Sequence, residues 1–262
     1  MRGQPPQPAL SKVEGAVQRT EATRSGHARG IKKIIESHMP AESTPEVFTD
    51  VKVDPFVRGF LHRPESPNGQ GLVLTHGAGS NCQTPLLVAI ASSFAAAGFL
   101  VLRCDLPFRQ DRPYGPPGPY DAKRDRAGLK NAIVALKNLA SASIFLGGHS
   151  YGGRQCSIFC AEQAEAEPGL LLMSYPLHPP RKPDQLRTQH FFNLRTPALF
   201  VQGTVDPFGT IDEIMQALKL IPAQTKLLTV EGAGHDLGFK GKSRKQELPA
   251  KVLEEFQAFF AS

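Results

Sequence analysis

The chain has 262 residues, of which 40% are hydrophobic, and this suits one medium-sized α/β domain with an extension. The formal net charge of +6 is modest, and no basic stripe is interleaved with aromatic residues, so nucleic-acid binding is not expected. No apolar run could span a bilayer and no signal-peptide core is evident, so we expect a cytoplasmic protein without membrane association. The four cysteines, at positions 82, 104, 156 and 160, form no metal-binding Cys-x-x-Cys pair, and free thiols fit a reducing compartment.

Residues 1–45 differ in composition from the rest of the chain. They are rich in Pro, Gln, Glu, Arg and Ser, and they carry seven Lys or Arg residues against four acidic residues. A segment with so few large apolar residues cannot bury enough surface to offset the entropy lost on ordering. We therefore expect a disordered or loosely packed N-terminal extension over residues 1–45 and one folded domain over residues 46–262.

From residue 47 onward, short apolar runs alternate with runs that are compatible with helices. An antiparallel pair of strands is expected first, followed by six buried strands, over residues 47–53, 57–61, 71–75, 99–103, 143–146, 170–175, 197–203 and 226–230. Helices are expected over residues 86–97, 121–140, 154–164, 211–220 and 248–260, with a short helix over residues 184–192. This alternation predicts an α/β fold with a mostly parallel central sheet covered by helices on both faces.

The strand at 143–146 runs into a glycine-rich turn that holds a serine at its apex. Gly148, Ser150 and Gly152 fit the pattern Gly-x-Ser-x-Gly of a nucleophile elbow. The serine of an elbow sits in a strained conformation, and its small neighbours let strand and helix approach closely. The helix that follows aims its free N–H groups at charge that develops beside the serine. An ordinary Gly-Ser turn gives the same five residues, so the flanking strand and helix decide in favour of the elbow.

An acid and a histidine follow the last two predicted strands. A serine hydroxyl needs a base to remove its proton, and the base needs an orienting carboxylate. In a parallel sheet such groups meet at the carboxyl ends of the strands. The order Ser150, Asp206, His235 therefore predicts a catalytic triad. Asp206 could instead form a turn before Pro207, and His235 could be a loop histidine, but their joint placement favours the triad.

Other residues compete for these two roles. Asp184 and Asp212 are weaker candidates for the acid, because one lies in a proline-rich stretch and the other begins a helix. His178 is the alternative base, although a loop-ordering residue or a pocket wall is the simpler interpretation.

Acyl transfer also needs N–H donors for the developing oxyanion. The backbone N–H groups of Tyr151 and Ala78 are the expected donors, because Tyr151 follows the nucleophile and Ala78 lies in the loop after an early strand. Gly77 in the same loop allows close backbone approach and is expected to contact the substrate. His76 is expected to be a structural hydrogen-bonding residue rather than a second base. No metal or cofactor is implied.

The loops around this site are short. About twenty residues separate Tyr175 from Pro197, which leaves no room for a large cap domain. The rim is expected to come from residues 107–120 and 177–182, with substrate contacts from Arg109 and His178. The rim carries four positive charges, at Arg109, Arg112, Arg181 and Lys182. These charges could favour an anionic substrate by charge complementarity, or they could simply be solvated surface charges.

These motifs resemble the α/β-hydrolase superfamily in its dienelactone-hydrolase-like branch. The resemblance rests on residues 75–79, 148–154, 203–206 and 232–235, and it extends over about residues 47–262. The segment 174–180 and the Gly-Gly-Arg after the elbow are similar to the testis-expressed and histone-acetyltransferase-complex-subunit type of hydrolase-like domain. Dienelactone hydrolases use a cysteine nucleophile, so the serine at position 150 argues against carrying over their lactone substrate.

The expected function is a serine hydrolase of carboxylic ester or related acyl bonds in a small-molecule substrate. It would act through an acyl-enzyme intermediate and need no cofactor. A non-catalytic hydrolase-like interaction module is the alternative, which the resemblance to a complex subunit suggests. A peptidase of the same fold is a third possibility, against which the missing cap weighs.

Overall fold

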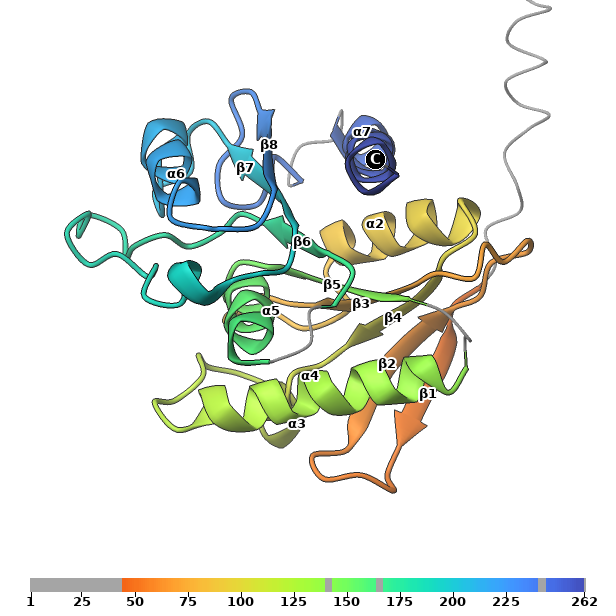
Figure 1. Cartoon of the computed structure of the whole chain (residues 1–262). Coiled ribbons are helices and arrows are strands. Elements are labelled where there is room, and N and C mark those ends of the chain that lie inside the picture. The colour runs from red at the N-terminus through yellow and green to blue at the C-terminus, as the bar shows by residue number, and fades with distance from the viewer. Residues whose placement is uncertain (1–43, 140–142, 164–166, 240–243, 262) are drawn as a thin grey trace, which may run out of the picture. The chain divides into compact units, whose positions relative to one another are not determined.

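The computed structural model describes residues 44–261, except residues 140–142, 164–166 and 240–243. The N-terminal extension expected over residues 1–45 lies almost entirely outside the described residues. The part of the chain that follows is built around one mixed sheet, with helices on both of its faces (Figure 1).

The described sheet has eight strands in the order β1-β2-β4-β3-β5-β6-β7-β8. The first two strands and the β2–β4 pair are antiparallel, and all other pairs are parallel. The bounds are β1 Glu46–Asp50, β2 Val57–His62, β3 Gly71–Thr75, β4 Leu100–Cys104, β5 Ile144–His149, β6 Leu170–Met173, β7 Ala198–Gly203 and β8 Thr225–Val230. The predicted strands are therefore confirmed, and β5 lies near the middle of the sheet.

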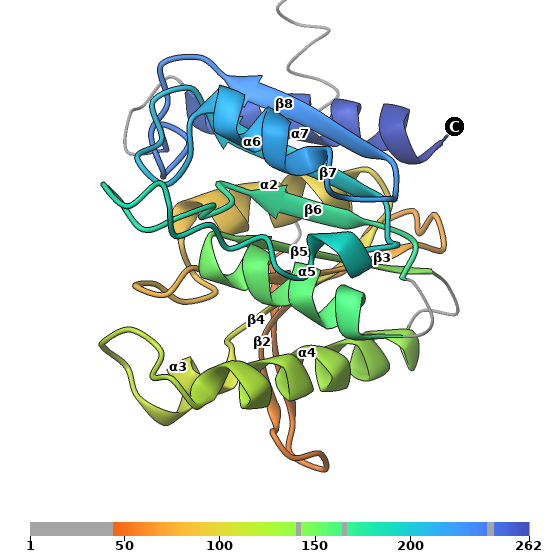
Figure 2. The same ribbon diagram turned by 60° about the vertical axis from the view of Figure 1, so that its left-hand side comes forward.

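Helices cover the sheet in two layers (Figure 2). One layer holds α2 (Pro85–Ala96) and α7 (Arg244–Phe260). The opposite layer holds α4 (Asp121–Lys137), α5 (Tyr151–Glu162) and α6 (Ile211–Leu218). The predicted helices at these positions are confirmed, with α7 beginning one turn earlier than expected.

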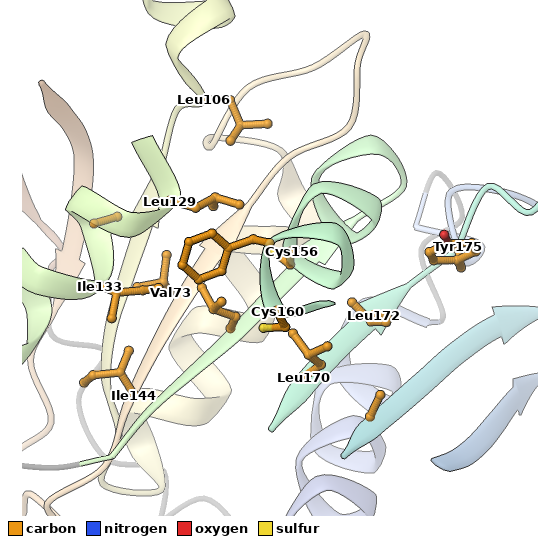
Figure 3. Packing of buried hydrophobic residues seen from close by; sticks show 14 of the residues in the cluster. Val73, Leu106, Leu129, Ile133, Ile144, Cys156, Cys160, Leu170, Leu172 and Tyr175 are labelled. Atoms are coloured by element: carbon orange, nitrogen blue, oxygen red, sulfur yellow. The ribbon is translucent and has the colours of Figure 1, made fainter. Parts of the chain in front are cut away.

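The core is divided by the sheet because successive strand side chains point to opposite faces. In β3, Val73 packs with α4 and α5, whereas Leu72 and Leu74 pack with α2 and α7. The side chains around Val73 are drawn in Figure 3. Cys156 and Cys160 of α5 lie in this cluster as buried free thiols.

The prediction of a short helix over residues 184–192 is wrong. Only a 3₁₀ turn, η1 (Phe191–Asn193), forms in this region. The backbone N–H of Arg187 donates to the carbonyl of Leu177 (2.8 Å), so it is not available for a helical bond to residue 183. Conversely, a short helix, α3 (Pro107–Asp111), forms where a loop was expected, and its proline occupies the first turn, where no N–H is needed. Residues 175–197 contain no cap domain, as expected.

Within the described residues, no helix is both long and apolar enough to cross a membrane.

A buried histidine ties β2 to β4. His62 is 2% exposed, and its Nε2 accepts a hydrogen bond from Arg103 Nε at 2.8 Å. Burial, and then the charge of Arg103, lower the pKa of His62 from 6.5 to about 4. The ring is therefore neutral in the folded chain, as an acceptor must be.

Replacing His62 with glutamine tests this assignment through the pH dependence of stability. The folded pKa lies below the unfolded value, so the unfolded chain takes up the proton first as the pH falls. The free energy of unfolding should therefore decrease as the pH falls from 6.5 to 4. His62 should contribute up to about 1.4 kcal/mol per pH unit to this decrease. Urea denaturation at several pH values in this window should give a shallower slope for His62→Gln. Equal slopes would contradict the assignment.

Candidate active site

The turn between β5 and α5 holds Ser150 in a strained conformation. Its φ of 52° and ψ of −118° are rare for a residue with a side chain and typically cost about 1–3 kcal/mol. Glycines make the turn possible: a Cβ atom on Gly148 would lie 2.6 Å from the backbone nitrogen of Gly153. A Cβ atom on Gly152 would lie 2.5 Å from the carbonyl oxygen of His76. The strand and the helix thus approach as closely as the Gly-x-Ser-x-Gly pattern predicted.

Three side chains that are far apart in the sequence meet at this turn. The Ser150 Oγ lies 2.7 Å from the Nε2 of His235. The Nδ1 of His235 lies 2.8 Å and 3.1 Å from the two carboxylate oxygens of Asp206. In this arrangement Nδ1–H donates to the carboxylate, so Nε2 is left to accept the hydrogen bond of the serine hydroxyl. The three side chains thus form one continuous hydrogen-bonded series, which is the arrangement that serine catalysis would require.

Asp206 is buried but well satisfied. It is 3% exposed, and it accepts hydrogen bonds from the backbone N–H of Phe208 (2.9 Å) and from Nε2 of Gln202 (3.1 Å). The ring of Phe208 lies against His235 with centroids 4.1 Å apart. Neither Gln202 nor Phe208 was predicted as a site residue from the sequence. A polar residue at the end of an otherwise apolar strand is the signal that could have identified Gln202.

His149, directly before Ser150, holds the backbone of His235 by a hydrogen bond. Its Nε2–H donates to the backbone carbonyl of His235 at 2.7 Å. Burial, and then the neighbouring His235, lower the pKa of His149 to about 4, so this ring stays neutral. The sequence gives no clear signal for this contact, because it joins two loops that are 86 residues apart.

His76 is buried in the neighbouring loop and does not face Ser150 as a base. Its Nδ1–H donates to the carbonyl of Gly77 (2.9 Å), and its Nε2 accepts from the N–H of Leu106 (3.1 Å). Burial lowers its pKa to about 4. Both ring nitrogens are thus engaged in holding loops together, which is the structural part expected of His76.

The two residues expected to bind the oxyanion, and the glycine expected to contact the substrate beside them, line a cavity of about 560 Å³ together with Ser150 and His235. These residues are Gly77, Ala78 and Tyr151. Tyr151 begins α5, so its backbone N–H has no acceptor one turn earlier in the helix. Its hydroxyl donates to the buried carboxylate of Asp125 at 2.7 Å, which anchors the side chain on α4. Within the described residues, no group of His, Cys, Asp or Glu side chains is placed to hold a metal ion.

Comparison with known protein families identifies the chain. A family model described as an alpha/beta hydrolase domain matches residues 68–261. The chain belongs to the α/β-hydrolase family. The closer resemblance to the testis-expressed and histone-acetyltransferase-complex-subunit type stays a prediction.

Solved structures of α/β hydrolases share the fold of this hydrolase domain. An α/β serine hydrolase homologue from Coxiella burnetii is 18% identical in sequence and has a TM-score of 0.64. The match covers 82% of this chain and 99% of the homologue. A dienelactone hydrolase from Anabaena variabilis is 19% identical with a TM-score of 0.62, and the match covers 82% of this chain and 98% of that protein. A serine hydrolase without a lid from Xanthomonas campestris is 15% identical with a TM-score of 0.62, and the match covers 86% of this chain and 98% of that protein. At these identities the likeness shows the fold.

Two residues expected to bind substrate lie elsewhere in the hydrolase domain. Arg109 does not line the cavity of Ser150. It is 5% exposed, and its guanidinium donates to four backbone carbonyls, those of Ala78, Ser80, Arg112 and Gly115. It therefore fixes the loop that carries Ala78 instead of contacting a substrate in that cavity.

His178 also lies away from this cavity. Its Nδ1–H donates to the carbonyl of Pro179 (2.8 Å), and its Nε2 lies 3.3 Å from a carboxylate oxygen of Glu213. His178 is therefore not the base beside Ser150, and its expected contact with substrate is wrong for this cavity. Its surroundings fit the loop-ordering interpretation.

The rim of the cavity is partly as expected. Pro116 and Pro117 come from the predicted loop over residues 107–120, but residues 177–182 do not contribute. Arg154 and Arg187 line the cavity instead, and the sequence analysis assigned neither of them to the site. The Gly-Gly-Arg after the elbow was a usable signal for Arg154, since it lies one helical turn beyond Ser150.

Alanine substitutions at two glycines test the steric basis of the elbow. Gly152→Ala places a Cβ atom against backbone, which cannot rotate away, and should lower the free energy of unfolding by about 1–3 kcal/mol. Gly79→Ala is the matched control, because nothing lies within 4 Å of its added Cβ atom. Urea denaturation of both variants measures the difference. Equal stabilities would contradict the packing described here.

Proposed function

We propose that this α/β hydrolase is a serine hydrolase of carboxylic ester or related acyl bonds. The observation that carries the proposal is the hydrogen-bonded series Ser150–His235–Asp206, in which Ser150 lies at the N-terminus of α5 and, with His235, in the wall of a cavity. A scaffold protein has no need of a strained serine, a base at 2.7 Å and a buried acid together. The presence of all three features disfavours the non-catalytic alternative.

The first half of the reaction forms an acyl-enzyme. The Oγ of Ser150 attacks the carbonyl carbon of the substrate while its proton passes to Nε2 of His235. The imidazolium that forms is stabilised by Asp206 through Nδ1–H. The carbonyl oxygen becomes an oxyanion, which accepts hydrogen bonds from the backbone N–H groups of Tyr151 and Ala78. Each such donor typically contributes about 10²–10³ in rate.

The second half returns the enzyme to its starting state. The tetrahedral intermediate collapses, and the leaving alcohol takes the proton from Nε2 of His235. A water molecule then attacks the acyl-enzyme and gives its proton to His235. Collapse of the second tetrahedral intermediate releases the carboxylic acid, and Ser150 Oγ recovers its proton. Every group in this scheme belongs to the chain or to the substrate and water.

Activity-based labelling tests the nucleophile and the base. A fluorophosphonate probe should label the wild-type chain, because the activated Oγ of Ser150 attacks its phosphorus. Labelling should be lost in Ser150→Ala and in His235→Ala. His178→Ala is the matched histidine control and should still be labelled. If the folded wild-type chain is not labelled and hydrolyses no ester of a panel, the result would instead favour the non-catalytic module.

Asp206→Asn tests the orienting acid. The amide of asparagine can donate to Nδ1, which would put the proton of His235 on Nε2 and remove the acceptor for the serine hydroxyl. The kcat for ester hydrolysis should fall by about 10⁴, as this loss of tautomer control does in serine proteases. Asp184→Asn, at an exposed position outside the cavity, is the control and should retain the wild-type kcat. Similar losses in both variants would argue against the assignment of Asp206.

A further inference from the structure

Two arginines enter the cavity of Ser150 from different elements. Arg154 lies in α5, and its backbone N–H donates to the carbonyl of Ser150 at 2.9 Å. Arg187 lies in the loop before η1, and its backbone N–H is held by the carbonyl of Leu177. Both side chains are partly buried, and both arise from backbone that is fixed by hydrogen bonds. Their positions in the cavity wall are therefore defined by the fold.

These two arginines lack the acidic partners that several other arginines of the described chain have. Arg58, Arg112, Arg124 and Arg126 each pair with a carboxylate. Within the described part of the chain, no carboxylate lies within ion-pair distance of Arg154 or Arg187. Two positively charged side chains therefore share one cavity without a carboxylate beside either of them.

The partners that Arg154 and Arg187 do have are neutral. Nη1 of Arg187 donates to the carbonyl of Pro176 at 3.3 Å, which is a long hydrogen bond. Arg154 interacts with the hydroxyl of Tyr175, whose pKa is raised by burial, so it stays protonated. The Nε of Arg154 is buried and has no hydrogen-bond partner among the described residues. This unused buried donor of Arg154 contrasts with Arg109, in which each of the three guanidinium nitrogens donates to at least one carbonyl.

The electrostatics of the neighbourhood agree with an uncompensated positive charge. Burial, and then the charge of Arg154, lower the pKa of Arg187. Burial, followed by the charges of Arg154 and Arg126, lowers the pKa of His190 to about 4. Holding two like charges together in a partly desolvated site is unfavourable unless an anion offsets them. Arginine forks suit carboxylate and phosphate oxygens in particular.

We propose that Arg154 and Arg187 form an anion subsite beside Ser150, so that the substrate is an acyl ester bearing a carboxylate or a phosphate group. This inference rests on the proposed hydrolase function for the scissile bond, but the anion subsite itself does not require turnover. Arg154 lies one helical turn from the nucleophile, so the acidic group lies only a few bonds from the scissile carbonyl. The remaining wall near Ser150 includes Pro116, Pro117 and Phe208, which suits a short apolar spacer.

A matched pair of substrates tests the preference. The probes are 4-nitrophenyl hexanoate and the 4-nitrophenyl monoester of adipic acid, which have acyl chains of equal length but differ by one terminal carboxylate. The wild type should hydrolyse the adipoyl ester with at least about 10-fold higher kcat/KM, because charge-assisted hydrogen bonds are the strong ones. The ratio of the two values should fall about 10-fold or more in Arg154→Gln and in Arg187→Gln. Arg195→Gln, at an exposed position outside the cavity, is the control and should keep the wild-type ratio.

A binding experiment separates this inference from the proposed function. Ser150→Ala cannot turn substrate over, so its affinity for monomethyl adipate and for inorganic phosphate can be measured by calorimetry. The affinity for at least one of them should fall about 10-fold or more when Arg154→Gln or Arg187→Gln is added, and not when Arg195→Gln is added. Tighter binding of phosphate than of monomethyl adipate would identify a phosphate ester as the substrate class, and the reverse order a carboxylate.

The outcomes are distinguishable. If Ser150→Ala binds neither anion, or binds them equally well without the two arginines, the subsite is overturned even when the wild type reacts with a fluorophosphonate. If anion binding depends on both arginines while the wild type is neither labelled nor active on esters, the subsite stands and the hydrolase proposal fails.

Discussion

The close approach between the end of β5 and the start of α5 is the constraint on which the site depends. Ser150 holds a positive φ because backbone packs around Gly148 and Gly152 at distances that exclude a Cβ atom. The same turn places the first N–H groups of α5, which have no acceptors within the helix, beside the serine hydroxyl. The strained conformation of the proposed nucleophile and the N–H groups that could receive an oxyanion are therefore consequences of one steric arrangement.

Buried polar side chains hold the loops around this turn by hydrogen bonds to backbone. Arg109 binds the carbonyls of the loop that contains Ala78, His76 joins that loop to Leu106, and His149 binds the carbonyl of His235. Burial lowers the pKa of both histidines to about 4, so near neutral pH they keep the unprotonated nitrogen or the tautomer that these contacts need. The loops that carry the proposed oxyanion donor and base are thus fixed by groups whose charge is constant over that range.

The parts of the molecule that sequence patterns predicted well depend on local rules. Apolar runs and glycines defined the strands, and strand order alone placed Ser150, Asp206 and His235 at one edge of the sheet, where the structure brings them together. The wrong expectations concern contacts between distant loops. No local pattern reveals that the N–H of Arg187 binds the carbonyl of Leu177, which excludes a helix there. In the same way, the carbonyls that surround Arg109 come from segments whose path the sequence does not specify.

The arginines show why charge in a sequence is weak evidence for a ligand until its partners are known. Arg109 was the natural candidate for an anionic substrate, but four carbonyls use its donors in the interior. Arg154 follows the elbow in sequence and lines the same cavity as Ser150, and its buried Nε has no hydrogen-bond partner among the residues that the structure describes. What separates a structural arginine from one available for binding is thus the saturation of its donors rather than its distance from the nucleophile. By that criterion the positive character of this cavity resides in Arg154 and Arg187, and the proposed anion subsite lies in the wall formed by α5 and the loop before η1.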